Sequence, residues 1–395
     1  MKKSNKNFNL LEPQSKEWGY KLMRSSPLSA RRVVVKLGSA LLIRSDGQGV
    51  DQDVLTDIVN GIQWLRQQGV EVVVVSSGAI ALGVNNLKLA TKPKALSQRQ
   101  ALAAIGQSLL MRAWRDTLGT FDIVGAQVLL THDDLGHRRR FLNARHTVRA
   151  ILDYSAVPII NENDTVATEE IKLGDNDNLS AQICSLVSAD LLIILSTFDG
   201  LFTADPAIDP ASKRISVVET IDEHITNLVG TSVTQVGTGG MATKLQAVRA
   251  ATRHGAAALI AQGRQPNVLQ RLMQGEDIGT YFTPQEGRVR GKRHWLAFTL
   301  KPAGALIVDS GAAIALVAHG RSLLPGGITT VTGNFDVGDA VKVIDLGGKE
   351  IARGLVSYNA DEIRRIAGYR SDRIETLLGY QHGDEVIHRD DLVLV

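Results

Sequence analysis

The chain has 395 residues, of which 44% are hydrophobic and 22% charged, which favours a globular protein of two or more domains. No apolar stretch reaches the roughly 18 residues of a membrane-spanning helix, and a single cysteine, Cys184, excludes an internal disulfide framework. The formal net charge is +3. We expect a cytoplasmic protein. We also expect Cys184 to be a buried structural thiol.

The first 30 residues are basic. Residues 1–32 carry eight Lys or Arg against two Glu, and they lack the apolar stretch of a secretion signal. The segment is rich in Lys and not clearly amphipathic, which argues against an organelle transit peptide. We therefore expect residues 1–30 to be a disordered extension.

Strands and helices alternate from residue 31 to about residue 263. The apolar runs predict strands at residues 33–35, 72–75, 123–130, 191–195 and 257–260. Helical spacing of apolar residues predicts helices at residues 53–68, 98–114, 141–152 and 244–254. Several strands are apolar on both faces, so we expect one α/β domain over residues 31–283, with a mostly parallel sheet covered by helices.

The pattern changes after a linker at residues 284–302 that contains Pro and Gly. Beyond it we expect short strands at residues 305–308, 329–331, 340–344, 350–356 and 386–388, and a helix at residues 360–366. Residues 303–395 should therefore form a small β-rich domain. Nine Lys or Arg against thirteen Asp or Glu give this domain a net charge of −4 with His neutral.

Two clusters of Asn and acidic residues indicate a ligand site. Residues 161–164 read Asn-Glu-Asn-Asp after an apolar run, and residues 174–178 read Gly-Asp-Asn-Asp-Asn before a helical run. Open α/β sheets bind ligands beyond the carboxyl ends of their strands. This density of short amide and carboxylate side chains suits a ligand with an amine and a carboxylate, or a metal–phosphate group.

Three further features suit a phosphate ligand, and each has a plainer alternative. Lys36 ends the first strand, where a lysine either holds a phosphate or is simply solvated. Ser76 and Ser77 precede a helix, either as donors to an anion or as an ordinary helix cap. Residues 237–244 are a glycine-rich run that ends in Lys244, either a phosphate-binding loop or a flexible one.

Taken together, these features favour phosphoryl transfer to a carboxylate. The sequence has no Walker A motif and no protein-kinase H-R-D or D-F-G pair, no side chain is placed as a nucleophile or base, and no metal ligand can be named. The side chain of glutamate ordinarily titrates with a pKa of about 4.3 and is already ionised at neutral pH. Positioning and charge stabilisation are then sufficient for an in-line transfer.

The motifs resemble those of the amino acid kinase family over about residues 31–265. In the expected order, the matching segments are V-V-V-K-L-G-S (33–39), V-V-S-S-G-A-I-A-L-G (74–83), R-F-L-N-A-R (140–145), P-I-I-N-E-N-D (158–164), E-I-K-L-G-D-N-D-N-L-S-A (170–181), G-L-F-T-A-D-P (200–206) and G-T-G-G-M-A-T-K (237–244). Within the family, the likeness is to members that phosphorylate glutamate. The tail, with L-L-P-G-G-I (323–328) and V-T-G-N-F (331–335), resembles the PUA domain that many bacterial members carry.

The resemblance implies an open αβα sandwich with a mostly parallel eight-stranded sheet, followed by a β-rich PUA-like domain. It implies transfer of the γ-phosphoryl group of ATP, with Mg²⁺, to the side-chain carboxylate of L-glutamate. The product would be L-glutamyl 5-phosphate, the first intermediate of proline biosynthesis. Feedback inhibition by L-proline and a homodimer or homotetramer are implied as well.

The resemblance also assigns roles to individual residues. The implied catalytic residues are Lys36, Lys244 and Asp177, with Asp177 orienting the two lysines. The implied glutamate-binding residues are Ser77, Asp164, Asn176 and Asn161. The implied ATP contacts are Lys36, Ser196, Thr197, Thr238, Gly239, Gly240, Met241, Ala242, Thr243 and Lys244. Thr197 departs from the family pattern, which has an aspartate there, and this leaves the detail of the nucleotide contact open.

Two alternative functions stay open. A sister kinase would phosphorylate aspartate, N-acetylglutamate or a nucleoside monophosphate, and an acetylated amine would need apolar contact where Asp164 and Asp177 stand. The other alternative is an RNA-binding protein that acts through its PUA-like tail. RNA affinity comes mainly from Lys and Arg contacts to phosphates, so the net acidic tail argues against a nucleic-acid partner.

Overall fold

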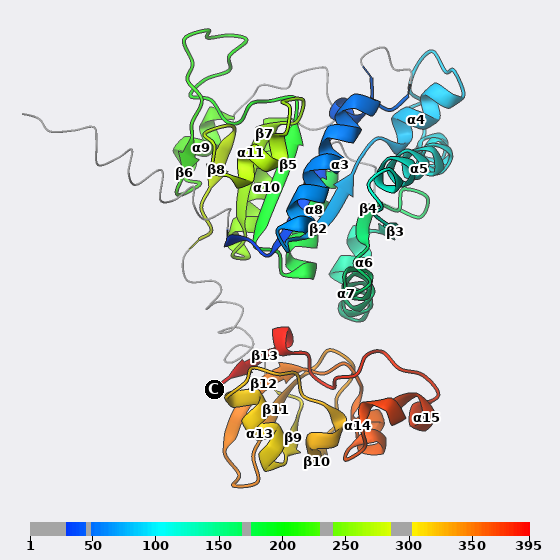
Figure 1. Ribbon diagram of the computed structural model, residues 1–395, viewed down its shortest axis with the longest axis vertical. Coiled ribbons are helices and arrows are strands. Elements are labelled where there is room, and N and C mark those ends of the chain that lie inside the picture. The colour runs from blue at the N-terminus through cyan, green and yellow to red at the C-terminus, as the bar shows by residue number, and fades with distance from the viewer. Residues whose placement is uncertain (1–28, 45–48, 168–174, 230–239, 286–301) are drawn as a thin grey trace, which may run out of the picture. The chain divides into compact units, whose positions relative to one another are not determined.

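The structure of the protein is a computed structural model that describes residues 29–44, 49–167, 175–229, 240–285 and 302–395. Within these ranges the chain forms two compact units, one up to residue 131 together with 151–285, and one from 132–150 together with the residues after 285 (Figure 1). The expected extension and linker fall almost wholly outside the described ranges. In the part that is described, no helix is both long enough and apolar enough to cross a membrane.

The first unit is built on an eight-stranded sheet with the order β3-β4-β2-β1-β5-β7-β8-β6. Neighbouring strands run parallel except for the antiparallel pair β7 and β8. The strands are β1 (Arg32–Leu37), β2 (Glu71–Ser76), β3 (Gly125–Leu130), β4 (Val157–Glu162), β5 (Leu191–Ser196), β6 (Val217–Val218), β7 (Ala257–Gln262) and β8 (Thr280–Phe282). The expected mostly parallel sheet is confirmed, and the short strands β6, at the edge, and β8, beside it, are not among the apolar runs predicted as strands.

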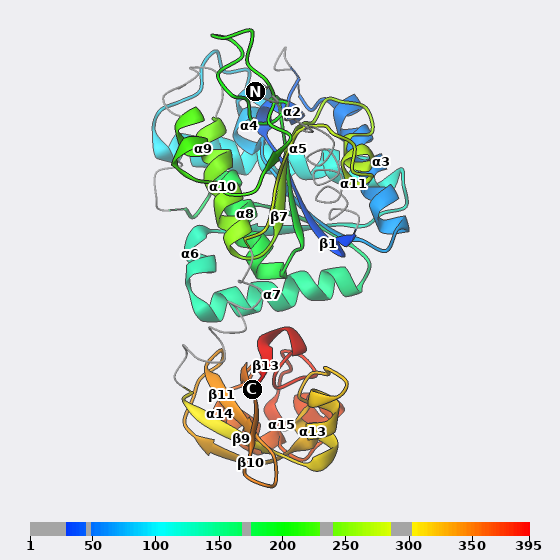
Figure 2. The same ribbon diagram turned by 90° about the vertical axis from the view of Figure 1, so that its left-hand side faces the viewer.

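Helices cover both faces of this sheet, as the expected αβα sandwich requires (Figures 1 and 2). Its helices are α2 (Ser39–Leu42), α3 (Gln52–Gln67), α4 (Ala79–Asn86), α5 (Leu96–Gly119), α8 (Asp175–Val187), α9 (Glu223–Leu228), α10 (Met241–Arg253) and α11 (Val268–Met273). Helices α3 and α11 pack together on one face, while α8 packs against β1 and β5 and also against α10.

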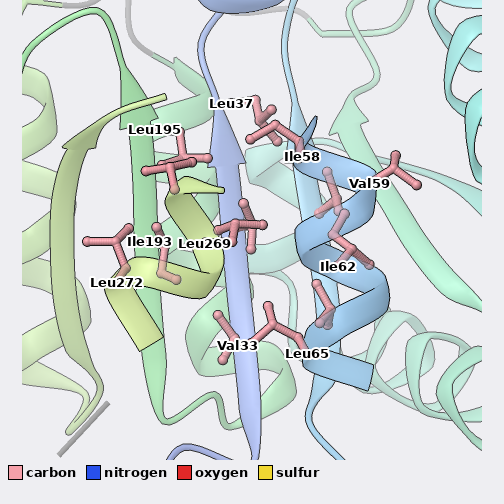
Figure 3. Packing of buried hydrophobic residues seen from close by; sticks show 14 of the residues in the cluster. Val33, Leu37, Ile58, Val59, Ile62, Leu65, Ile193, Leu195, Leu269 and Leu272 are labelled. Carbon is pink, nitrogen blue, oxygen red and sulfur yellow. The ribbon is translucent and has the colours of Figure 1, made fainter. Parts of the chain in front are cut away.

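The alternation of side chains along β1 explains how an apolar strand delivers a lysine to the ligand site. Val33 and Leu37 pack in one buried cluster with Ile62 of α3 and Leu269 of α11 (Figure 3). Successive side chains of a strand point to opposite faces, so Lys36 points away from this cluster. The side chain of Lys36 therefore lies on the face of the sheet that α8 covers.

The second unit contains a five-stranded sheet with the order β10-β9-β11-β12-β13. The strands are β9 (Gly304–Val308), β10 (Ile328–Gly333), β11 (Ala340–Ile344), β12 (Glu350–Leu355) and β13 (Leu392–Leu394). The helices are α6 (His132–Gly136), α7 (Arg138–Asp153, of which residues up to 150 fall in this unit), α13 (Ser310–Val317), α14 (Ala360–Ile366) and α15 (Ile374–Leu378). The expected helix at residues 360–366 is confirmed.

The expected strand at residues 386–388 is wrong. Ile387 makes only an isolated bridge to Leu323, and the strand that completes the sheet is β13. Val386 and Ile387 are both fully buried in the core of the unit, so their apolar character reflects a buried connection and not a strand of the sheet.

Charged residues join α7 to the end of the chain within this second unit. The Arg145 guanidinium forms an ion pair with Asp391, and both side chains are buried. Arg149 pairs with Asp390 at 3.0 Å. Burial, together with the charge of Arg149, lowers the pKa of His388 to about 4, so this imidazole is neutral at physiological pH. A buried ion pair is costly to break, because the remaining partner keeps its charge without compensation.

Candidate active site

Four adjacent parallel strands end at one edge of the large sheet. In the order β4-β2-β1-β5, their carboxyl ends carry Asn161, Ser76, Lys36 and Ser196. Strand β2 adds to one side of β1, and β5, which comes later in the sequence, adds to the other side of β1. Such a switch in strand order opens a crevice at the carboxyl ends of the strands, and ligands bind there in open α/β sheets.

Asp177, near the start of α8, lies between two lysine ammonium groups at this edge. Lys36 Nζ pairs with Asp177 Oδ1, and Lys244 Nζ lies 3.4 Å from Asp177 Oδ2. The Thr243 hydroxyl donates to the same Oδ2 at 2.8 Å. Asp177 is 0% exposed and each lysine is 4% exposed, so two buried cations share one buried anion.

The pKa shifts follow from this arrangement. Burial disfavours the ionised form of Asp177, but the charges of Lys36 and Lys244 outweigh it and lower the pKa of Asp177 below its ordinary value. Burial also lowers the pKa of Lys244, with Asp177 opposing this effect and Lys36 adding to it. Lys36, Asp177 and Lys244 together contribute two positive charges and one negative charge, which favours a further anion such as a transferring phosphoryl group.

Side chains from three elements form a hydrogen-bonded chain beside this cluster. Asn176 Nδ2 donates to Ser77 Oγ at 2.8 Å and to Asn161 Oδ1 at 2.9 Å. The turn that presents Ser77 requires Gly78, whose φ of 119° favours glycine. Gly78 is also the cap of α4 and no side chain caps that helix, so the alternative of an ordinary serine cap is wrong.

One acceptor among these hydrogen-bonded side chains, the side-chain oxygen of Asn176, has no partner among the described residues. Asn176 Oδ1 is buried and accepts no hydrogen bond from any residue that the structure describes. A buried polar atom without a partner costs free energy. A ligand that donates a hydrogen bond to this oxygen, such as an ammonium group, would remove that cost.

Asp164 follows β4 and brings in two cations that the sequence analysis missed. Asp164 is partly buried. Burial and the charge of Arg99 lower the pKa of Lys92, while Asp164 opposes that shift. Lys92, Asp164 and Arg99 are therefore close enough to interact. Lys92 stands in the loop before α5 and Arg99 in its first turns, and the only signal for them was their positive charge.

Apart from Lys36 on β1, the described residues expected to contact nucleotide lie at the carboxyl end of β5 and at the start of α10. Ser196 is buried and its Oγ accepts from the Phe198 N–H at 3.0 Å, while Thr197 is exposed. Gly240, Met241, Ala242 and Thr243 form the cap and first turn of α10, ahead of Lys244. Thr238 and Gly239 lie outside the described residues.

Comparison with known proteins assigns the chain to a family. The model of the amino acid kinase family matches residues 31–262. The glutamate 5-kinase of Syntrophotalea carbinolica is 48% identical over 373 residues, which cover 94% of this chain and 100% of that protein. The glutamate 5-kinase of Geobacter sp. (strain M21) is 49% identical over 365 residues, which cover 92% of this chain and 98% of that protein. The chain belongs to the amino acid kinase family.

The model of the PUA domain matches residues 304–378, within the second unit. The amino acid kinase fold and the β-rich PUA-like domain expected from the sequence are therefore both confirmed.

An amino acid kinase uses ATP with a divalent metal ion, and the described residues do not form a cage for that ion. No group of three or more His, Cys, Asp or Glu among them could hold a metal, and Asp177 is paired with the two lysines. These residues fit a cation that is held mainly by nucleotide phosphates and water, as Mg²⁺ commonly is. Cys184 is buried, and burial raises its thiol pKa, so the expected inert structural thiol is confirmed.

Proposed function

We propose that this amino acid kinase transfers the γ-phosphoryl group of ATP to the side-chain carboxylate of L-glutamate and releases L-glutamyl 5-phosphate, the first step of proline biosynthesis. The observation that carries the proposal is the buried carboxylate of Asp177 shared by Lys36 and Lys244 at the switch point of the sheet. The glutamate 5-kinases that match nearly the whole chain support glutamate as the acceptor.

In this proposal, Lys36 and Lys244 stabilise the charge of the transferring phosphoryl group. Asp177 keeps both ammonium groups in place and favours the charged form of Lys244. The acceptor carboxylate is already ionised at neutral pH, so no side chain has to remove a proton from it. Catalysis then depends on alignment and on charge stabilisation, which is the usual requirement of phosphoryl transfer.

Ser77, Asn176 and Asp164 bind the glutamate acceptor in this scheme. The unpartnered Asn176 Oδ1 and the carboxylate of Asp164 suit the ammonium group of the amino acid. Lys92 and Arg99, whose charges act on the same region, suit its α-carboxylate. A free ammonium group is favoured over an acetylated amine, because the acetylated nitrogen is uncharged and carries only one N–H donor.

The ATP-contacting residues of the proposal are Ser196, Thr197 and the segment 238–244, which leads to Lys244. We also propose that the divalent ion is Mg²⁺. When bound, it would neutralise negative charge on the nucleotide phosphates.

Four further properties complete the proposal. We place residues 31–283 in the kinase domain and 303–395 in the PUA-like domain, joined by a linker at 284–302, with 1–30 as an extension. We propose a homo-oligomer, inhibition by L-proline at or over the glutamate site, and a cytoplasmic location.

A hydroxamate assay tests the proposed reaction directly, because hydroxylamine traps acyl phosphates. The purified chain is incubated with ATP, Mg²⁺ and, in parallel, L-glutamate, L-aspartate or N-acetyl-L-glutamate. We expect ATP-dependent hydroxamate with glutamate at a kcat/KM at least about 100-fold above that with the other two acceptors, since recognition of a substrate by paired polar groups discriminates strongly. Faster reaction with aspartate or N-acetylglutamate would identify a sister kinase and refute the proposal.

A further inference from the structure

A glutamine on α5 extends the hydrogen-bonded chain of the acceptor site. Asn161 Nδ2 donates to Gln107 Oε1 at 2.7 Å. The chain therefore runs from Gln107 through Asn161 to Asn176, and from there to Ser77. Gln107 lies 54 positions before Asn161 in the sequence and belongs to none of the motifs that point to the site.

The backbone fixes the direction of every bond in this chain. The Glu162 N–H donates to Asn161 Oδ1 at 2.9 Å, so the amide nitrogen of Asn161 must point the other way, toward Gln107. Only the oxygen of Gln107 can accept from that nitrogen. On the other side, Asn161 Oδ1 accepts from Asn176 Nδ2, which leaves Asn176 Oδ1 as the unpartnered acceptor.

Asn161 links Gln107 to Asn176 in this series of hydrogen bonds. It is 3% exposed, and its oxygen already accepts from both Glu162 N–H and Asn176 Nδ2. Its nitrogen loses a buried partner if the oxygen of Gln107 is removed. A buried donor left without a partner costs roughly 1–3 kcal/mol, which is enough to change the preferred orientation of a side chain.

Close packing of α5 on α4 holds Gln107 in place. A methyl group added at Gly106 would lie 1.7 Å from the Ala79 carbonyl oxygen, and one added at Gly83 would lie 2.1 Å from the Leu102 carbonyl oxygen. The two helix backbones can approach this closely only because both positions are glycine. Gln107, next to Gly106, is thereby carried to the end of β4.

We propose that Gln107 is a positioning residue that orients Asn161 and, through it, Asn176, so that the carbonyl oxygen of Asn176 faces the ammonium group of the amino acid substrate. This inference rests on the proposed function, which assigns Asn176 to the acceptor site. If the amide of Asn176 were reversed, it would present an NH₂ group to the substrate ammonium and lose one hydrogen bond while adding a repulsive contact.

The test compares the steady-state kinetics of four variants of the full chain with the wild type. Gln107→Leu removes the acceptor of Asn161, and Asn176→Ala removes the group that is oriented. The double variant measures their coupling. Gln52→Leu is the matched control, because Gln52 Nε2 also makes one short side-chain hydrogen bond to α5, at 2.7 Å to Thr117 Oγ1, away from the acceptor site. Thermal unfolding is recorded for each variant.

We expect Gln107→Leu to raise the KM for glutamate about tenfold, the equivalent of one lost hydrogen bond. The KM for ATP should stay within about twofold, because the hydrogen bonds that link Gln107 to Ser77 do not include Lys36 or Lys244. In the Asn176→Ala background, Gln107→Leu should add less than about twofold, since the group it orients is gone. Gln52→Leu should leave both KM values unchanged.

The outcomes separate the inference from the function on which it rests. An unchanged glutamate KM in Asn176→Ala would refute the assignment of Asn176 to the acceptor site. A raised KM in Asn176→Ala with an unchanged KM in Gln107→Leu would refute only the role of Gln107. Equal effects of Gln107→Leu in both backgrounds would also refute it, because they would show that Gln107 acts independently of Asn176. Parallel rises of both KM values with a lower Tm would indicate a merely structural residue.

Discussion

Replacing Asp177 by Asn removes the carboxylate charge that Lys36 and Lys244 share, while keeping the shape of the side chain. At an effective dielectric constant of about 20, the 3.4 Å separation of Lys244 Nζ from Asp177 Oδ2 corresponds to about 5 kcal/mol of gross attraction. Part of this is offset by the cost of burying the charges, and removal of one partner of a buried pair typically destabilises a protein by about 3–5 kcal/mol.

The protein can respond to this change in two ways, and both are measurable. Either the lysines stay charged and the free energy of unfolding falls by about 3 kcal/mol, or Lys244 loses its proton. Asp177 favours the ammonium form of Lys244, so its removal lowers the pKa of Lys244 further than burial already does. The ammonium is lost as pH rises through this pKa, so activity in the variant should decline at a lower pH than in the wild type.

The assay is hydroxamate formation by Asp177→Asn and wild type from pH 6 to pH 9, with urea unfolding at the same pH values. We expect turnover at pH 7.5 to fall at least about 100-fold, as the loss of a preorganised charge at a transition state commonly does. Wild-type turnover with an unchanged pH profile and unchanged stability would show that Asp177 does not govern the lysines, and would refute the reasoning.

Four other predictions concern separate parts of the molecule. Lys244→Ala should lower kcat by about 100-fold or more while urea unfolding remains cooperative, and wild-type turnover would remove this residue from the catalytic set. Asp164→Ala should raise the glutamate KM about tenfold with little change in kcat, and an unchanged KM would contradict its role in binding. Arg145→Ala should reduce the free energy of unfolding by about 3 kcal/mol, because buried Asp391 loses its partner; full stability in thermal denaturation would disprove that account. Gly106→Ala should destabilise by about 1–3 kcal/mol through its clash with α4, so a Tm equal to that of the wild type would contradict the close packing of the two helices.

The sequence predicts the large sheet well because the signals there are local. Apolar runs such as residues 72–75 and 191–195 can only be buried strands when helices separate them, and β2 and β5 match them within one residue. The short strands β6 and β8 are two and three residues long, so they are too short to show a period. The expected strand at 386–388 fails for another reason, since an apolar pair in a core connection resembles the start of a strand.

The same distinction applies to the candidate site. Lys36, Ser77 and Asn161 could be anticipated, because each follows an apolar strand and parallel strands end at one edge. Asp177 and Asn176 could be anticipated as well, because their motif at residues 174–178 stands directly before a helical run. Gln107 has no such signal, since a single glutamine inside a long helix resembles any solvated residue. Its position is set by the contact between α4 and α5, which only tertiary structure specifies.

The central claim is that Lys36 and Lys244, held by Asp177, receive the phosphoryl group that is transferred to glutamate. The most direct measurement is a crystal structure of the protein with a non-hydrolysable ATP analogue, Mg²⁺ and L-glutamate. The account predicts the γ-phosphate within hydrogen-bond distance of both ammonium groups, with the glutamate side-chain carboxylate in line on its other side. A triphosphate bound away from both lysines would contradict it.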